Sequence, residues 1–290
     1  MTDPLVVVLA FDEGYVTMGL VAMTSAIEAT STVTHERISF VVIDCGITEA
    51  GRARVERTVA PHPVAFHLLD LSMWDDLDLT GPRPSYARIV LDDAVPAEVG
   101  RAIYLDADTL VNASLRELLD TDLHGRIVGA APDELTSPMS TERAAWGIPD
   151  WEARGIPAGM MYFNAGIMVV DVTAWRAAQV QARVLATLRE GPPSADWDQG
   201  LLNRVLWNEW WPLDPRWNGR GLDDHIAHFK GPSKPWNPDY RATPVKARYV
   251  ELADAIGWTL PRSDRMALRT ATRRWAQRLT PPVLRELRTR

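Results

Sequence analysis

The chain has 290 residues, 46% of them apolar and 24% charged, a composition typical of a soluble globular protein with a complete hydrophobic core. That length accommodates one large domain or two small ones. The single cysteine, Cys45, excludes a disulfide framework and is typical of a reducing compartment. The net charge of −7 argues against a protein that binds nucleic acid, so we expect no nucleic-acid partner.

The charge is unevenly distributed. Residues 262–290 contain nine arginines and two acidic residues, so this segment carries +7 and the preceding residues carry −14. We therefore divide the chain into a body, 1–261, and a basic C-terminal tail, 262–290. The tail has helical spacing, with Leu268, Trp275 and Leu279 on one face and arginines around the rest. Such a helix either binds an anionic membrane surface or folds back onto the acidic body, and both interpretations stay open.

The N-terminal segment, residues 1–10, has no basic region and no cleavage signature, so we interpret it as a first strand rather than a signal peptide. We expect a cytoplasmic protein. If the tail binds lipid, the contact would be peripheral and on the inner face of the membrane.

Strand and helix patterns alternate through the first seventy residues. Continuous apolar runs predict strands, and the segments between them have helical spacing. The predicted elements are a strand at 5–11, a helix at 18–29, a strand at 38–43, a helix at 48–60 and a strand at 64–69. This alternation is typical of a doubly wound α/β sheet, in which ligands bind beyond the carboxyl ends of the strands.

The α/β pattern continues through the remaining body. The predicted elements are a helix at 86–91, strands at 102–105 and 127–131, a helix at 114–119, a strand at 162–171 broken by Gly166, a helix from Val172, a helix opened by Asp196, and a short strand before His228. Residues 137–157, rich in Pro, Gly and Trp, are predicted to form a mobile loop over the site.

The strand at 102–105 leads into two carboxylates, Asp106 and Asp108. Residues i and i+2 on extended backbone point the same way, so we expect both carboxylates to face one point. Two like charges so close together raise a pKa or attract a cation, and hard divalent metals often lie between carboxylates and substrate phosphates. For an isolated pair, a turn at the end of the strand is the commoner explanation.

Five segments of the chain resemble, in order and spacing, glycosyltransferase family 8, which includes glycogenin and the bacterial lipooligosaccharide galactosyltransferases. They are Tyr-Ala-Arg at 86–88, Tyr-Leu-Asp-Ala-Asp at 104–108, Phe-Asn-Ala-Gly at 163–166, Asp-Gln-Gly-Leu-Leu-Asn at 198–203 and His-Phe-Lys-Gly-Pro-Ser-Lys-Pro-Trp at 228–236. The resemblance implies a GT-A fold, which is a Rossmann-like mixed sheet flanked by helices in a single catalytic domain. It also implies a UDP-sugar donor, Mn(II) or Mg(II), and retention at the anomeric carbon.

The resemblance implies that Asp106, Asp108 and His228 hold the metal, which bridges the donor phosphates beside Asp106. Histidine is a common metal ligand through its neutral imidazole, although His228 could also be a half-buried structural histidine. Arg88 and Lys234 are the cations expected at the diphosphate, Arg as a planar fork and Lys as a point charge. A solvated surface lysine is the alternative for Lys234.

Other positions of the resemblance imply contacts with the rest of the donor. Asp12 and Tyr15 would contact uracil and ribose, and Asn164 and Gly166 would lie against the donor sugar. Asp133 matches a position near the donor and acceptor sugars. In the loop at 228–236, Gly231 would let backbone N–H groups approach phosphate closely.

Asp198 and Gln199 match the family residues beside the transferred sugar and are the candidate catalytic residues. Asp198 would bind sugar hydroxyls, and the amide of Gln199 would lie near the reacting carbon. The bacterial galactosyltransferases carry a second acid after this Gln, whereas this chain has Gly200, as glycogenin does. A carboxylate nucleophile is therefore absent at that position, which favours front-face attack over double displacement.

Taken together, the sequence predicts a retaining, metal-dependent transferase that moves glucose or galactose from a UDP-sugar to a carbohydrate or lipid-linked glycan hydroxyl, as in glycan or lipopolysaccharide biosynthesis. Two alternatives stay open: a glycogenin-like primer that glucosylates itself, and a nucleotide-sugar-binding protein that does not catalyse. A dinucleotide-binding Rossmann enzyme is excluded because no G-x-G-x-x-G follows the first strand.

Overall fold

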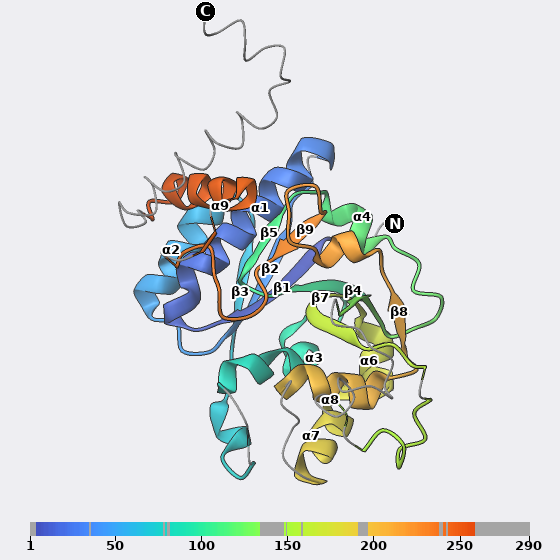
Figure 1. The fold of residues 1–290 in the computed structure, drawn as a ribbon. Helices are drawn as coiled ribbons and strands as arrows, with labels where there is room; N and C mark the ends of the chain where they lie inside the picture. The colour runs from blue at the N-terminus through green and yellow to red at the C-terminus, as the bar shows by residue number, and fades with distance from the viewer. Residues whose placement is uncertain are drawn as a thin grey trace, which may run out of the picture.

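The structure is a computed structural model that describes residues 4–34, 36–77, 79, 82–133, 148, 150–157, 159–190, 197–237, 240–241 and 243–258. Within these residues the chain forms a seven-stranded mixed sheet flanked by helices, together with a two-stranded ribbon (Figure 1). The predicted α/β fold with a mixed sheet is confirmed. The predicted basic tail and most of the predicted loop at 137–157 lie outside the described residues.

The first part of the chain builds the parallel half of the sheet and the helices beside it. Its elements are β1 (Val6–Phe11), the 3-10 helix η1 (Glu13–Tyr15), α1 (Val16–Thr34), β2 (Ser39–Asp44), α2 (Glu49–Val59), β3 (Val64–Leu68), the 3-10 helices η2 (Leu71–Trp74) and η3 (Arg83–Val90), α3 (Leu91–Ala94) and β4 (Arg101–Leu105).

The second part adds the antiparallel strands, the ribbon and the remaining helices. Its elements are β5 (Thr109–Val111), α4 (Leu115–Leu119), β6 (Val128–Pro132), β7 (Phe163–Asp171), α6 (Val172–Ala177), α7 (Val180–Glu190), α8 (Trp197–Leu206), β8 (Trp210–Pro212), the 3-10 helix η4 (Pro215–Asn218), β9 (Ile226–His228) and α9 (Pro244–Ala255).

The strand order is β3-β2-β1-β4-β7-β6-β8. Strands β3, β2, β1 and β4 pair in parallel, whereas β7 runs antiparallel between β4 and β6. The direction of the sheet therefore changes between β4 and β7. Asp106 lies at this change, and its backbone N–H donates to the carbonyl of Gly166 on β7 at 2.8 Å. Ligands of open α/β sheets bind in the crevice beyond the carboxyl ends of the strands, where the strand order reverses. Here the order reverses between β1 and β4, which lead into Asp12 and Asp106.

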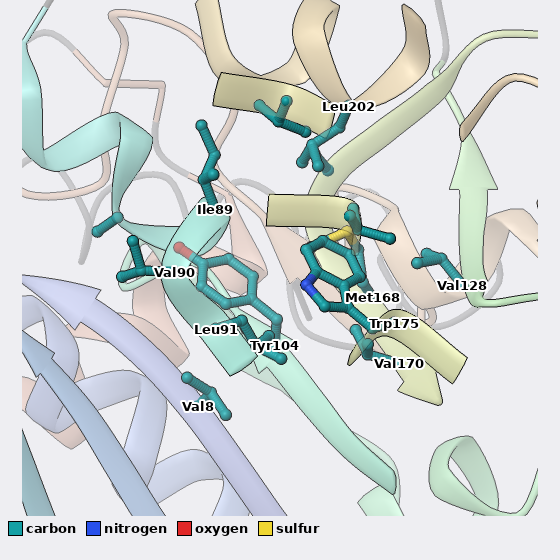
Figure 2. Close-up of a cluster of buried hydrophobic side chains, with 14 of the residues drawn as sticks. Val8, Ile89, Val90, Leu91, Tyr104, Val128, Met168, Val170, Trp175 and Leu202 are labelled. Atoms are coloured by element: carbon teal, nitrogen blue, oxygen red, sulfur yellow. The ribbon is translucent and has the colours of Figure 1, made fainter. Parts of the chain in front are cut away.

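Both faces of the sheet are buried. Along β1, Val6 and Val8 belong to one apolar cluster, while Val7 and Leu9 belong to the cluster on the opposite face. Helices α1, α2 and α4 cover one face, and α3, α6, α7 and α8 cover the other (Figure 1). On the face covered by α3, α6, α7 and α8, the indole of Trp175 packs among side chains from β4, β6 and β7 (Figure 2). Burial on two faces explains why the strands appear in the sequence as continuous apolar runs rather than alternating ones.

Helix α1 is more apolar than most surface helices. The segment Glu13–Thr34 is long and apolar enough, by length and composition, to cross a membrane. Half of its most apolar window is buried inside the protein, and Leu20, Met23 and Ala26 are fully buried in the core under the sheet. Packing on the sheet is therefore a sufficient reason for this composition.

Several elements differ from the prediction. Strand β7 is continuous through Gly166, so the predicted break at this glycine is wrong. The segment predicted as a helix at 86–91 is a 3-10 helix that continues into α3, and α1 is longer at both ends than predicted. Strand β5 and helices α7 and α9 were not predicted at all.

Candidate active site

Asp106, Asp108 and His228 converge at the carboxyl end of β4. Strand β5 follows Asp108 and pairs with β9, in a register that places Thr109 opposite His228. As a result, His228 Nε2 lies 3.3 Å from Asp108 Oδ1 and 3.5 Å from Asp106 Oδ2. One ligand atom from each of the three residues lies within 4.8 Å of the others.

The two carboxylates face one point, as expected, but for a different reason. The extended backbone of β4 ends at Leu105, and residues 107–108 form a turn. The turn, and not the two-residue repeat of a strand, brings Asp108 beside Asp106. Asp108 is then held from the ribbon side, because the N–H of Phe229 donates to its backbone carbonyl at 3.0 Å.

The donor set fits a hard divalent cation. Carboxylate oxygens are preferred ligands of Mg(II) and Mn(II), and a neutral imidazole can complete such a site. The room for this cluster depends on Gly166. A Cβ at this position would lie 2.2 Å from Cε1 of His228 and 2.6 Å from Oδ2 of Asp106. The glycine therefore allows β7 to pass directly beneath the candidate metal ligands.

The surroundings of Asp106 favour proton retention more than those of Asp108. Asp106 Oδ1 accepts from Tyr104 Oη at 3.1 Å and from Arg88 Nη2 at 2.9 Å. Burial nevertheless raises the pKa of Asp106, although the charges of Arg88 and His228 act against it. Burial also acts to raise the pKa of Asp108. The net effect is nevertheless a lowered pKa, because His228 and Lys234 stabilise the carboxylate.

Arg88 connects the candidate metal ligands to the candidate catalytic residues. Its side chain is buried, and it forms ion pairs with Asp106 at 2.9 Å and, through Nε, with Asp198 at 2.7 Å. A third contact runs from Nη1 to the carbonyl of Ala165 on β7. Burial raises the pKa of Asp198 to about 6, even though the guanidinium of Arg88 opposes this shift.

On the far side of Arg88, the side-chain amides of Asn164 and Gln199 share one carboxylate. Both donate to Oδ2 of Asp133, at 3.3 and 3.1 Å. Oε1 of Gln199 accepts from the N–H of Ala165 at 3.1 Å, so both ends of this amide are fixed. The result is a polar floor beside Asp198, made from β7, α8 and the end of β6.

A cavity of about 690 Å³ joins these groups, a size typical of small-ligand sites. The predicted site residues that line it are Asp12, Tyr15, Arg88, Asp106, Asp108, Asn164, Gly166, Asp198, Gln199, His228, Gly231 and Lys234. Among the described residues, the lining does not include Asp133, which is buried behind Asn164 and Gln199. Asp133 therefore orients two lining amides rather than facing the cavity itself.

The remaining predicted residues lie on two loops at the mouth of the cavity. Asp12 caps η1 by accepting from the N–H of Tyr15 at 3.2 Å, and Tyr15 contacts the edge of Trp236 with ring centroids 6.1 Å apart. Gly231 has φ +82, a left-handed conformation that favours glycine. Lys234 is paired with Asp108 and donates to the carbonyl of Phe229, so it is not a freely solvated lysine.

Trp197 and Asn218 are among the residues of the site that the sequence analysis missed. Trp197 lines the cavity with 39% of its surface exposed and has φ +49, which is uncommon for a bulky side chain. Asn218, in η4, contacts the ring of His228, with Oδ1 3.0 Å from Nδ1. The position of Trp197 beside Asp198 was a usable signal. Asn218 had none, because its role depends on where η4 lies in three dimensions.

The model of the family described as Glycosyl transferase family 8 matches residues 6–239. The chain belongs to this family. Its relatives include General stress protein A of Bacillus subtilis, which is 26% identical over 77% of this chain and 85% of the relative. Lipopolysaccharide glucosyltransferase WaaO of Escherichia coli is 26% identical over 60% of this chain and 55% of the relative, so this chain spans about half of that protein.

Among solved structures, the galactosyltransferase LgtC in complex with donor and acceptor sugar analogs superposes with a TM-score of 0.70. The two sequences are 25% identical, and the match covers 91% of this chain and all of that one. The likeness to LgtC confirms the predicted GT-A fold, and membership of the family confirms a glycosyltransferase. The family membership, together with the Asp106, Asp108 and His228 cluster, also supports a divalent-metal site.

Proposed function

We propose that this glycosyltransferase is a retaining, metal-dependent enzyme that moves glucose or galactose from a UDP-sugar to a hydroxyl of a carbohydrate or lipid-linked glycan. The observation that carries the proposal is the convergence of Asp106, Asp108 and His228 in the same cavity as Asp198 and Gln199. A glucosyltransferase and a galactosyltransferase among its similar proteins support the donor class.

Asp106, Asp108 and His228 would hold Mn(II) or Mg(II). When bound, such an ion neutralises the negative charge that develops on the leaving diphosphate. Lys234 and Arg88 supply further positive charge at this end of the cavity. These cations and the metal also explain how a body with a net negative charge can bind an anionic donor.

The mouth of the cavity would receive the nucleotide. Tyr15 is 39% exposed there and lies against Trp236, so it offers an aromatic surface to a base or a ribose. Asp12 lines the same mouth and presents carboxylate oxygens to the hydroxyl and N–H groups of a nucleoside. Gly231 also lines the cavity, and the absence of a side chain there would let the backbone approach the phosphates closely.

The sugar would lie over Asp198, Asn164 and Gln199. Asp198 in its ionised form accepts hydrogen bonds from sugar hydroxyls, and Arg88 holds it in place. Gln199 is an amide, Gly200 follows it, and neither can form a glycosyl ester. We therefore propose front-face attack: the bond from the acceptor oxygen to the anomeric carbon forms as the bond to the phosphate oxygen breaks. The acceptor proton passes to that phosphate oxygen.

A basic tail would bring the enzyme to its acceptor. Residues 262–290 carry nine arginines, and we propose that they bind the anionic inner face of the membrane of a cytoplasmic enzyme whose acceptor is lipid-linked. Sedimentation with anionic vesicles tests this proposal. A chain that ends at residue 261 should lose binding, and equal binding by both chains would contradict a membrane role for the tail.

The stereochemistry of transfer tests the mechanism. Proton NMR of the enzyme with an α-linked UDP-hexose and Mn(II) should show the α-anomer as the first product, before mutarotation. A β-anomer as the first product, or a hexose trapped as a glycosyl ester on a carboxylate of the cavity, would contradict front-face retention. Intact mass after the same incubation separates the alternatives, because a self-glucosylating primer gains hexose units whereas a transferase releases its product.

A further inference from the structure

A line of side-chain hydrogen bonds, buried except for the part-buried last link, runs from His228 to Gln199. Its links are His228 Nδ1 to Asn218 Oδ1 at 3.0 Å, Asn218 Nδ2 to Asn164 Oδ1 at 2.8 Å, Asn164 Nδ2 to Asp133 Oδ2 at 3.3 Å, and Gln199 Nε2 to the same Asp133 oxygen at 3.1 Å. The line thus joins the candidate metal ligand to the candidate catalytic amide. We call it the amide line.

The backbone of β7 determines which side-chain atoms donate and which accept along the amide line, and we call this order its direction. The N–H of Gly166 donates to Oδ1 of Asn164 at 3.1 Å, and because a backbone N–H can only donate, this side-chain atom is an acceptor. Asn218 contacts the same oxygen and must therefore present its amino group, Nδ2, to it. The carbonyl oxygen of Asn218 consequently turns toward His228.

The tautomer of His228 follows from this direction. A side-chain carbonyl oxygen can only accept, so the 3.0 Å contact places the ring proton of His228 on Nδ1. In the neutral ring, Nε2 then carries the lone pair. Without a metal, this nitrogen, which lies 3.3 Å from Asp108 and 3.5 Å from Asp106, can also hold a proton that it donates to these carboxylates. A neutral imidazole binds metal through its unprotonated nitrogen, and a hydrogen bond from the other nitrogen orients the ring.

The other end of the amide line is fixed in the same way. The N–H of Ala165 donates to Oε1 of Gln199, so this amide presents Nε2 to Asp133. Two successive N–H groups of β7, from Ala165 and Gly166, therefore set the orientation of the sugar-side amide and of the metal-side imidazole together. Asn218 is the member of the line that transmits this direction to the ring.

We propose that Asn218 is a positioning residue that holds His228 as its Nδ1–H tautomer for metal binding and ties the ring to the sugar-side amides. The proposal rests on the proposed function for the identity of the ligand but not for the tautomer. Asn218 is 2% exposed and lies in η4, outside the segments that carry the resemblance to the family.

Histidine NMR tests the tautomer without any activity. In nitrogen-15 histidine spectra of the metal-free protein, with His228 assigned from its His228→Gln variant, the Nδ1 of His228 should carry a proton both in the cationic ring and in the neutral ring at higher pH. In Asn218→Ala, this preference should be lost. A wild-type ring protonated only on Nε2 would overturn the proposal.

Metal affinity tests the positioning role. Removing a partner that orients a metal ligand costs about 10–100-fold in affinity, so Asn218→Ala should weaken Mn(II) binding, measured by electron paramagnetic resonance, by that factor. Asn218→Asp should bind Mn(II) within about threefold of wild type, since its carboxylate still accepts from Nδ1. It should nevertheless lower kcat with little change in KM for the donor, because it cannot donate to Asn164.

Asn203→Ala is the matched control. This buried asparagine bonds to the backbone of Phe163 and Gln199 but does not contact His228, so its variant should lose stability while keeping Mn(II) affinity. Equal Mn(II) affinity for Asn218→Ala and wild type would overturn the proposal. A wild-type protein that binds no Mn(II) would instead overturn the proposed function, and the NMR result would still decide the tautomer.

Discussion

The cavity has two ends that the chain builds differently. At the metal end, Asp108 is paired with Lys234, a residue that also lines the cavity, so under the proposed function we expect metal and donor to replace this contact. At the sugar end, Asn164 and Gln199 bond to Asp133 and to β7, so their orientation is complete before any ligand arrives. Under the proposed function, the comparison indicates a site that is preorganised at the sugar end and completed by its ligands at the metal end.

Arg88 stands at the border between the two ends. Its guanidinium pairs with Asp106 on one side and Asp198 on the other, and its side chain is nearly inaccessible to solvent. Removing one partner from a buried ion pair leaves an uncompensated charge, so each of the three groups depends on the other two. A substitution of Asp106 or Asp198 should therefore alter the remaining ion pair of Arg88.

The largest effect is expected for Gly166→Ala. The added Cβ would lie 2.2 Å from the ring of His228 and 2.6 Å from the carboxylate of Asp106, so one of these groups must move. Displacing metal ligands should reduce Mn(II) affinity and transfer by more than about 100-fold. Gly159→Ala is the control, since no atom of the described residues lies within 4 Å of its added Cβ. A Gly166→Ala enzyme with wild-type Mn(II) affinity would show that the metal end does not depend on this glycine.

Arg88→Lys should have the next largest effect, because an ammonium cannot replace a fork that reaches Asp106 and Asp198 at the same time. We expect the free energy of unfolding, measured in urea, to fall by about 1–3 kcal/mol, together with a loss of transfer activity. The control is Arg248→Lys, whose partly exposed ion pairs should contribute less than about 1 kcal/mol. Equal stability losses for both variants would contradict the bridging role of Arg88.

The sugar end should titrate in a measurable range. Because burial raises the pKa of Asp198 to about 6, its carboxylate is ionised above that pH and protonated below it. Ionised Asp198 accepts from sugar hydroxyls, so donor affinity at constant Mn(II) should fall about tenfold between pH 7 and pH 5. Asp198→Asn should bind more weakly at pH 7 and should lose this part of the pH dependence. A donor affinity of the wild-type enzyme that rises as the pH falls would contradict the proposed role of the ionised Asp198 carboxylate.

The smallest effect is expected for Lys234→Gln. This substitution should raise the affinity for Mn(II) and lower the affinity for UDP. Without the lysine, Asp108 no longer has to release a cation, so Mn(II) affinity in the absence of nucleotide should rise by about 0.5–1 kcal/mol, roughly two- to fivefold. UDP affinity in the presence of Mn(II) should fall, because a diphosphate partner is lost. A fall in both affinities would contradict the idea that the metal replaces Lys234 as the partner of Asp108.

The parallel half of the fold could be predicted because each strand is buried on two faces and appears as an apolar run. Strand β5 could not, since three residues carry no periodicity, yet its pairing with β9 brings His228 to Asp108. Gly166 was interpreted as a break in a strand, whereas the structure shows that it leaves room for the ring of His228. Such contacts arise between distant segments, and no local pattern encodes them.

In the candidate site too, some features could be predicted from local sequence and others depend on contacts between distant segments. Twelve of the residues that line the cavity were predicted, most of them from short motifs, because chemistry requires particular side chains at those positions. Asp133 and Asn218 act one step behind the lining, through the orientation of other side chains. Their roles depend on hydrogen-bond geometry that appears only after η4, β6 and β7 are placed together.

The most direct test of the account is UDP release from a panel of UDP-sugars, with and without Mn(II), by the wild-type chain and by Asp108→Ala. The account predicts turnover of UDP-glucose or UDP-galactose that requires the metal and is lost in the variant. Turnover that needs no divalent metal, or that persists in Asp108→Ala, would contradict the central claim that Asp106, Asp108 and His228 form the metal site of this transferase.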